Sequence, residues 1–493
     1  MKQLVSILML SALMMLSSAG VQARNVSEQE ARAAAAYFMT YNTYHQDITA
    51  DDLTLVYQID NMKLGVAAAY IYNVGDWGWV IMCANTATDP VVGFSDLGNL
   101  VEYQKLPANM RWYVEGYCDM INEVQIADAE ENFKDCDEWV DLLEQRLTTN
   151  TKDQQIILSP LQWGQGDDFN PTYNMYSPVV THDGQSYHCP VGCVALAMAQ
   201  ICKYYSFPKK PTGRKNHNWH GTALSLYYDT MYFDYSLMPN YGLSNTSTVA
   251  EKRETSKLCY ALGISVNMDF DWDGSGAFSQ DVPYAMNGYF RYTLGSYSLR
   301  PASTNGGDTI WLRKQRDDLI GNRLVYMSGA SSTGSGSDAA GHAWVCAGYM
   351  RDTESKYFMN WGWEGGGNGF YNLKTNNMPI QYYGYNFNQR QGHILNMTPP
   401  NNDSTNVPFV GIPTVEDRTE LGIAHPNPAT VSVSLPYTAT SATELEVYGI
   451  DGKVVLTRSL PAGRGAARVN VSDMPAGIYI YRIGGETGKF MVR

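Results

Sequence analysis

The pattern of apolar and polar positions predicts a compact first unit. Apolar residues recur at helical spacing in "SEQEARAAAAYFMTY" (27–41), and Ser27 followed by Glu30 is typical of a capping box at a helix start. Strand-like runs follow at 53–59, 64–74 and 77–84, and a second helical pattern covers 112–133. We therefore expect a small α+β domain near the N-terminus.

The end of the chain has a different period. Short runs alternate apolar and polar residues and are separated by Gly, Pro and Asp turns, at 431–437, 444–450, 453–460, 467–472 and 477–483. This pattern predicts a small all-β sandwich. Before it, "TPPNNDSTNVPFVGIPT" (398–414) lacks periodicity and is interpreted as a linker.

The first residues form a segment of a third kind. Lys2 precedes an apolar run over 4–16 that is too short to span a bilayer, and Val21-Gln22-Ala23 then offers a small-x-small cleavage pattern. We expect an export signal and a mature start near Arg24. No later segment reaches about 18 uninterrupted apolar residues, so we expect no membrane span after signal removal.

Charge separates the first unit from the rest of the chain. Residues 24–149 hold 21 acidic against 7 basic residues, whereas 150–493 hold 28 against 27. The acidic segment is therefore expected to be a separate module. The absence of a basic patch argues against a nucleic-acid-binding protein. Polar residues 147–155 mark its boundary, as a site of proteolytic nicking or a plain interdomain linker.

The eight cysteines lack the dense, regular spacing of a disulfide scaffold, and most are expected to be small buried apolar residues. A four-ligand zinc site needs two close pairs, and only Cys189 and Cys193 are close. We therefore expect no metal and no organic cofactor.

Cys193 is the candidate nucleophile. In "HCPVGCVALAMAQI" (188–201) it follows Pro190 and Gly192, and apolar residues then recur at helical spacing until Pro208. A thiol at a helix N-terminus has a lowered pKa, because the macrodipole favours the thiolate.

A thiolate nucleophile also needs a base. His342 follows a Gly/Ser-rich stretch at the start of an apolar run, where it is either a cleft residue or a partly buried surface histidine. Eighteen residues later, Asn360 is expected to accept the imidazole N–H, with Trp361 shielding that bond from water. Gln165, in an expected tight turn, is the candidate side-chain donor to an oxyanion, beside the backbone N–H of Cys193.

Four segments in this order resemble the active-site blocks of the streptopain family of papain-like cysteine peptidases: "WGQG", "GCVALAMAQICKYYSFP", "GHAWVCAG" and "NWGWEGGGNGFYNL". The resemblance covers roughly 150–398. It implies that Cys193 is the nucleophile, His342 the general base and later acid, and Gln165 an oxyanion donor, with Asn360 and Trp361 as orienting elements. "GFSDLGNL" (93–100) with its preceding strands resembles that family's inhibitory propeptide. Cys189 departs from the pattern of few thiols, so an inhibitory Cys189–Cys193 disulfide is conceivable.

The last unit contains "HPNPA", "VYGIDGKVV", "MPAGIYIYRI" and a terminal "KFMVR", and it resembles the type A sorting domain of type IX secretion cargo in Bacteroidetes. The resemblance implies that the type IX machinery is a partner. It also implies export through the periplasm and outer membrane of a Gram-negative bacterium, followed by release or surface attachment. The alternative is a plain carbohydrate-binding or stalk module.

Together these features predict a secreted cysteine endopeptidase made as a zymogen. It would cleave proteins or peptides through a thioester acyl-enzyme, and its own prodomain would be its intramolecular inhibitor. Two alternatives remain, namely another Cys-His acyl-transfer enzyme of the amidase or transglutaminase kind, and a catalytically inert surface adhesin. The expected parts are a signal peptide (1–23), an inhibitory α+β prodomain (24–151), a papain-like α+β catalytic domain (152–398), a linker (399–417) and an all-β sorting domain (418–493).

Overall fold

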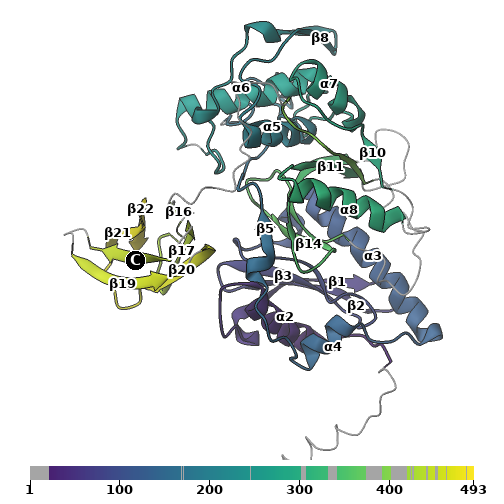
Figure 1. Ribbon diagram of the computed structural model, residues 1–493, viewed down its shortest axis with the longest axis vertical. Coiled ribbons are helices and arrows are strands. Elements are labelled where there is room, and N and C mark those ends of the chain that lie inside the picture. The colour runs from purple at the N-terminus through teal and green to yellow at the C-terminus, as the bar shows by residue number, and fades with distance from the viewer. Residues whose placement is uncertain are drawn as a thin grey trace, which may run out of the picture.

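The structure is a computed structural model, shown as a ribbon in Figure 1. It describes residues 22–167, 169, 171–244, 246–300, 307–330, 341–373, 391–400, 419–421, 424, 427–439, 442–449, 453–461, 463–484 and 486–493. Nearly all of the expected signal peptide and linker, and the Gly/Ser-rich stretch at 331–340, lie outside these residues. None of the described helices combines the length and apolarity needed to cross a membrane.

The N-terminal unit has the predicted mixture of helices and strands. Its helices are α2 (Glu28–Asn42), α3 (Ala108–Glu131) and α4 (Asp137–Leu143), and its strands are β1 (Leu53–Asn61), β2 (Val66–Val74), β3 (Gly78–Cys83) and β4 (Val91–Ser95). The capping box at Ser27 and Glu30 is confirmed, because each side chain meets the other residue's backbone N–H. The second helix begins at Ala108, before the apolar pattern at 112.

The central unit consists of helices and strands from 155 onward. The helices are α5 (Cys193–Tyr205), α6 (Val249–Ser265), α7 (Val282–Gly288) and α8 (Gly307–Ile320). The strands are β5 (Gln155–Ile157), β6 (Val179–His182), β7 (Gln185–His188), β8 (Arg214–Trp219), β9 (Thr222–Tyr227), β10 (Ser298–Leu299), β11 (Val325–Ala330), β12 (Gly341–Met350), β13 (Lys356–Asn360), β14 (Gly369–Asn372) and β15 (Gly392–Ile394). Helices α5, α6 and α7 lie together at the end of the molecule opposite α2 and α4 (Figure 1).

The first two units share one sheet. Among the described residues it runs in the order β1-β2-β3-β4-β14-β13-β12-β11-β15-β10, with β5 added alongside β12. The junction is the antiparallel pair β4 and β14, where Phe94 lies opposite Phe370. One apolar core includes buried side chains from both units. The acidic segment is therefore joined to the central unit through this sheet, which its charge did not indicate, because charge reports the solvated surface and not strand pairing.

The C-terminal unit is the predicted all-β sandwich. Its strands are β16 (Thr419–Leu421), β17 (Ser432–Ala439), β18 (Thr443–Tyr448), β19 (Val454–Leu460), β20 (Gly463–Asn470), β21 (Gly477–Ile483) and β22 (Glu486–Val492). They form a sheet in the order β16-β17-β20 and a second in the order β19-β18-β21-β22. Residues of both sheets enclose a core of their own.

Candidate active site

A glycine places Cys193 at the start of α5. Gly192 has φ of 84°, in the left-handed region that favours glycine, and a Cβ there would lie 2.5 Å from Sδ of Met268. The helix continues to Tyr205, and all of its residues from Val194 to Cys202 are buried. The predicted helix and the position of the thiol at its N-terminus are thus present in the structure.

The Cys193 thiol is partly buried and has a lowered pKa. Burial by itself raises the pKa, but the charge and side-chain hydrogen bond of His342 outweigh it, with help from the backbone N–H groups of Ala343 and Val194. Cys202 and Cys346 show the opposite outcome, since burial raises the pKa of each to about 12. Among these thiols, Cys193 is the one whose surroundings favour the thiolate.

His342 is the second residue of β12 and is 8% exposed. Its Nε2 lies 3.3 Å from the carbonyl oxygen of Trp361. With the N–H on Nε2 donated to this oxygen, Nδ1 is the ring nitrogen available to the thiol of Cys193. The structure therefore brings together the two residues, far apart in the sequence, that the hypothesis paired.

The expected contact between Asn360 and the imidazole is wrong. The Asn360 Nδ2 donates to the carbonyl oxygen of Leu161 at 2.7 Å and to Oε1 of Gln200 at 2.6 Å. Its Oδ1 accepts from the backbone N–H of Gly362 at 3.1 Å. The Asn360 side chain thus stabilises the turn after β13. The main-chain carbonyl of the next residue, Trp361, is the acceptor for the imidazole of His342.

Trp361 and Trp363 form the wall beside His342. Trp361 is fully buried and packs on Trp344, with ring centroids 5.1 Å apart. The ring of Trp363 stacks at 18° to that of His342, with centroids 5.9 Å apart, and is 39% exposed. Trp363 is the more exposed of the two tryptophans. Sequence reasoning missed it, although the repeated tryptophan of "NWGW" was visible.

Gln165 lies beside the nucleophile segment, because its carbonyl oxygen accepts from the backbone N–H of Val191 at 3.0 Å. The adjacent Gly166 has φ of 107°, and a Cβ there would lie 2.2 Å from the side chain of Asn174. Buried Asn174 also ties this loop together, since its amide bonds the backbones of Asp167 and His188. No sequence signal pointed to Asn174, because a lone asparagine belongs to no motif.

None of the eight cysteines, all of which lie in the described residues, takes part in a disulfide in the structure. The conceivable Cys189–Cys193 disulfide is therefore not formed. Among the described residues, one group of potential metal ligands lies close together, Asp89, Cys136 and Glu138. It belongs to the N-terminal unit and takes no part in the Cys193 site.

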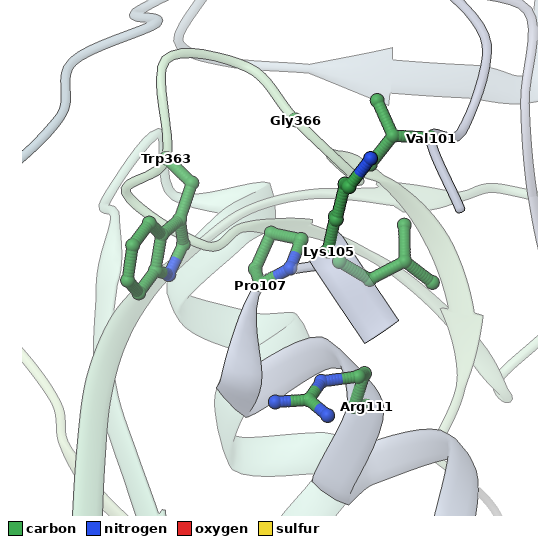
Figure 2. A pocket seen from close by; sticks show the side chains of 7 residues that line it. Val101, Lys105, Pro107, Arg111, Trp363 and Gly366 are labelled. Carbon is green, nitrogen blue, oxygen red and sulfur yellow. The ribbon is translucent and has the colours of Figure 1, made fainter. Parts of the chain in front are cut away.

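The N-terminal unit contacts the loop that carries the tryptophans. The ring of Tyr113 on α3 lies 5.9 Å from that of Trp361. Figure 2 shows Trp363 and Gly366 beside residues of the first unit. These residues line a cavity of about 380 Å³. The N-terminal unit contributes Val101, Lys105, Leu106, Pro107 and Arg111 to the lining of this cavity.

Three segments of the chain match known families. Residues 163–371 match the peptidase C10 family, 23–121 match the Spi protease inhibitor family, and 424–493 match the secretion system C-terminal sorting domain. The matches occur in the order of the three structural units.

Whole proteins are similar over parts of the chain. The thiol protease/hemagglutinin PrtT of Porphyromonas gingivalis is 28% identical over 317 residues, which are 63% of this chain and 34% of that protein. Streptopain of Streptococcus pyogenes is 26% identical over 351 residues, 67% of this chain and 79% of streptopain. The chain thus spans about a third of the length of PrtT. A solved structure of prointerpain A from Prevotella intermedia matches 71% of this chain and 99% of its own, with a TM-score of 0.52 and 20% identity, which shows a shared fold.

Proposed function

We propose that the chain is a secreted cysteine endopeptidase made as a zymogen, because residues 163–371 match the peptidase C10 family, 23–121 the inhibitor family and 424–493 the sorting domain. The observation that carries this proposal is the pairing of Cys193 with His342, which lowers the pKa of a thiol at a helix N-terminus. A thiol activated by an adjacent imidazole in this way can carry out nucleophilic acyl transfer.

In the proposed reaction, the Cys193 thiolate attacks the carbonyl carbon of the scissile peptide bond and forms a C–S bond. The developing oxyanion accepts from the side-chain amide of Gln165 and from the backbone N–H of Cys193, which has no intrahelical acceptor at the first helical position. The His342 imidazolium gives its proton to the leaving nitrogen as the C–N bond breaks.

The second half of the reaction releases the acid product. Water attacks the thioester carbon while His342 takes its proton, the C–S bond breaks, and the thiolate leaves with the electron pair. The carbonyl of Trp361 holds the ring in one orientation through both halves. None of these steps uses a metal or an organic cofactor.

Inhibition by the prodomain is supported by its contacts with the loop that orients His342. Strand β4 pairs with β14, directly after this loop, and Tyr113 packs against Trp361. Asn372 adds a buried polar contact, since its Nδ2 donates to Oδ2 of Asp89 at 2.7 Å. Held in this way, the loop has a fixed conformation until the prodomain leaves.

The exposure of the residues around 147 supports processing before residue 151. Residues 144–146 and 148–150 are exposed, whereas the Lys152 side chain is 4% exposed and pairs with Asp96 at 2.6 Å. Residues 155–157 then form β5 on the strand that carries His342. The first half of the predicted boundary at 147–155 is thus the part that a protease can reach.

The C-terminal unit belongs to the export pathway in this proposal. The secretion system C-terminal sorting domain spans 424–493, and its partner is the type IX secretion machinery of the outer membrane. Export places the enzyme at the cell surface or outside the cell, where proteins and peptides are its substrates.

The decisive experiment is to express the full chain and a Cys193→Ala variant and to measure casein hydrolysis and covalent labelling by an epoxide inhibitor of cysteine peptidases. Hydrolysis with labelling of Cys193, both absent from the variant, is the expected result. Amine incorporation into casein instead of amine release would identify an acyl-transfer enzyme, and an unlabelled inert thiol would favour the adhesin.

A further inference from the structure

One face of the nucleophile helix touches three parts of the site. Cys193, Leu196 and Gln200 lie at positions i, i+3 and i+7 of α5, which share a helix face. Cys193 meets His342, as its lowered pKa reports. Leu196 lies against Gly362, where a Cβ would come within 2.8 Å of Cδ2 of Leu196. Gln200 meets Asn360.

The orientations of the two side-chain amides are fixed by backbone groups. The N–H of Gly362 can only donate, so it selects Oδ1 of Asn360, and the carbonyl of Leu161 can only accept, so it selects Nδ2. Nδ2 also faces Gln200 at 2.6 Å, and Gln200 therefore presents its oxygen.

Asn360 thus joins three segments: the stretch leading to Gln165, the nucleophile helix and the turn after β13. Trp361 lies between Asn360 and Gly362, and its carbonyl oxygen holds His342. Both members of the amide pair are buried, at 1% exposure each. The amide pair is consequently a rigid link from the nucleophile helix to the group that orients the base.

We propose that Gln200 is a positioning residue that sets the separation of the Cys193 sulfur and the His342 imidazole through Asn360 and the Trp361 carbonyl. The proposal deepens the proposed peptidase function and rests on it for the meaning of the pair. No position in α5 after Cys193 is otherwise assigned a part in the reaction.

An energetic feature separates this role from a merely structural one. Nε2 of Gln200 is buried and has no hydrogen-bond partner among the described residues. Replacing Gln200 with an apolar residue of similar size removes this unsatisfied donor but also leaves one N–H of Asn360 without its acceptor, so the two effects oppose each other and the net change in stability should be small. A loss of activity without a loss of stability is what a positioning role predicts.

The test uses Gln200→Met in the full chain, with Gln315→Met as the matched control. Gln315 on α8 is also fully buried, and neither of its amide atoms has a partner in the described part of the chain. We expect Gln200→Met to lower kcat/KM on the order of tenfold to a hundredfold, as small misplacements of reacting groups do. The melting temperature should change little, because the loss of one unsatisfied amide donor offsets the loss of the bond to Asn360.

A second readout does not depend on peptidase activity. Alkylation of Cys193 by iodoacetamide, followed by mass spectrometry across a pH series, reports the thiolate fraction. We expect the midpoint to move to higher pH in Gln200→Met and to stay at the wild-type value in Gln315→Met. If the wild-type chain lacks peptidase activity but the midpoint still moves in Gln200→Met, the link is supported and the proposed function is removed.

A Gln200→Met protein with the alkylation profile and kcat/KM of the Gln315→Met control would overturn the proposal. If Gln200→Met does not fold, Gln200→Asn replaces it, because the shorter amide stays polar but withdraws its oxygen from Asn360. The same shift is then expected, and an unshifted profile overturns the proposal equally.

Discussion

The carbonyl oxygen of Trp361 lies 3.3 Å from Nε2 of His342, so a main-chain group and not a side chain bonds this nitrogen of the proposed base. A main-chain acceptor stays in place under substitution of its own residue as long as the turn keeps its shape. The side chains that matter for orientation are therefore those that hold the turn, Asn360 foremost.

The first prediction concerns Trp361 itself. In Trp361→Phe the carbonyl remains, so we expect peptidase activity to fall less than about tenfold, while the smaller ring lowers the free energy of unfolding by about 1–3 kcal/mol. Casein hydrolysis and urea unfolding measure the two effects, and His342→Ala is the control for loss of the base. A loss of activity in Trp361→Phe as large as in His342→Ala would show that the indole has a direct part in the reaction.

The second prediction concerns the pH dependence of Cys193. Because His342 lowers its pKa, the thiol should react with iodoacetamide at pH values below the ordinary thiol pKa of 9.0, and the activity should persist there. In His342→Ala the lowering contribution is lost, and the reaction should move to alkaline pH. The buried Cys202 is an internal control that stays unreactive in both proteins. An unchanged profile in His342→Ala would mean that the two groups do not interact.

The third prediction concerns the loop of Gln165. Gly166→Ala forces a Cβ to within 2.2 Å of the Asn174 side chain and strains a φ of 107°, so the loop must shift. We expect kcat/KM to fall on the order of tenfold or more, as it does when an oxyanion donor is displaced. Gly274→Ala is the matched control, since nothing lies within 4 Å of a Cβ there. Equal activity of the two variants would remove Gln165 from the mechanism.

The fourth prediction concerns acid stability and His45, whose ring stacks on Trp77 with centroids 3.7 Å apart. Burial lowers the pKa of His45 to about 4, against a usual value of 6.5. As pH falls from 6.5 to 4, the unfolded chain takes up a proton that folded His45 does not, so the stability present above pH 6.5 is progressively lost.

The loss at His45 should amount to about 1–3 kcal/mol. His45→Phe keeps an aromatic ring on Trp77 and does not titrate, so its stability should fall less over this window. Urea unfolding at a series of pH values measures the difference. Identical pH dependence in the two proteins would assign the acid sensitivity to other groups.

The fifth prediction concerns the contact between the prodomain and the catalytic unit. Asn372→Leu removes the donor to Asp89 and should weaken the hold of the prodomain, so processing of the full chain should be faster. Asn216→Ala, on an exposed strand of the catalytic unit, is the control. Electrophoresis over time follows the processing, and equal rates would argue against a restraining role for Asn372.

The sequence determined the local elements and pointed to the residues of the proposed site. Helical spacing and the capping box fixed α2, and the glycine before Cys193 with the slim alanine-rich run after it fixed α5. Alternation fixed the strands of the C-terminal sandwich. These features depend on residues within a few positions of one another along the chain, so they can be recognised from the sequence alone.

Only the tertiary structure decided which groups meet. Asn360 can bond an imidazole or a backbone, and its partners became Leu161, Gln200 and Gly362 because α5 and the segment before Gln165 pack against the turn. In the same way, β4 joined β14 although the acidic charge of the first unit suggested a boundary. Hydrogen-bond partners and strand neighbours are set by packing between distant segments, and neither periodicity nor composition encodes that packing.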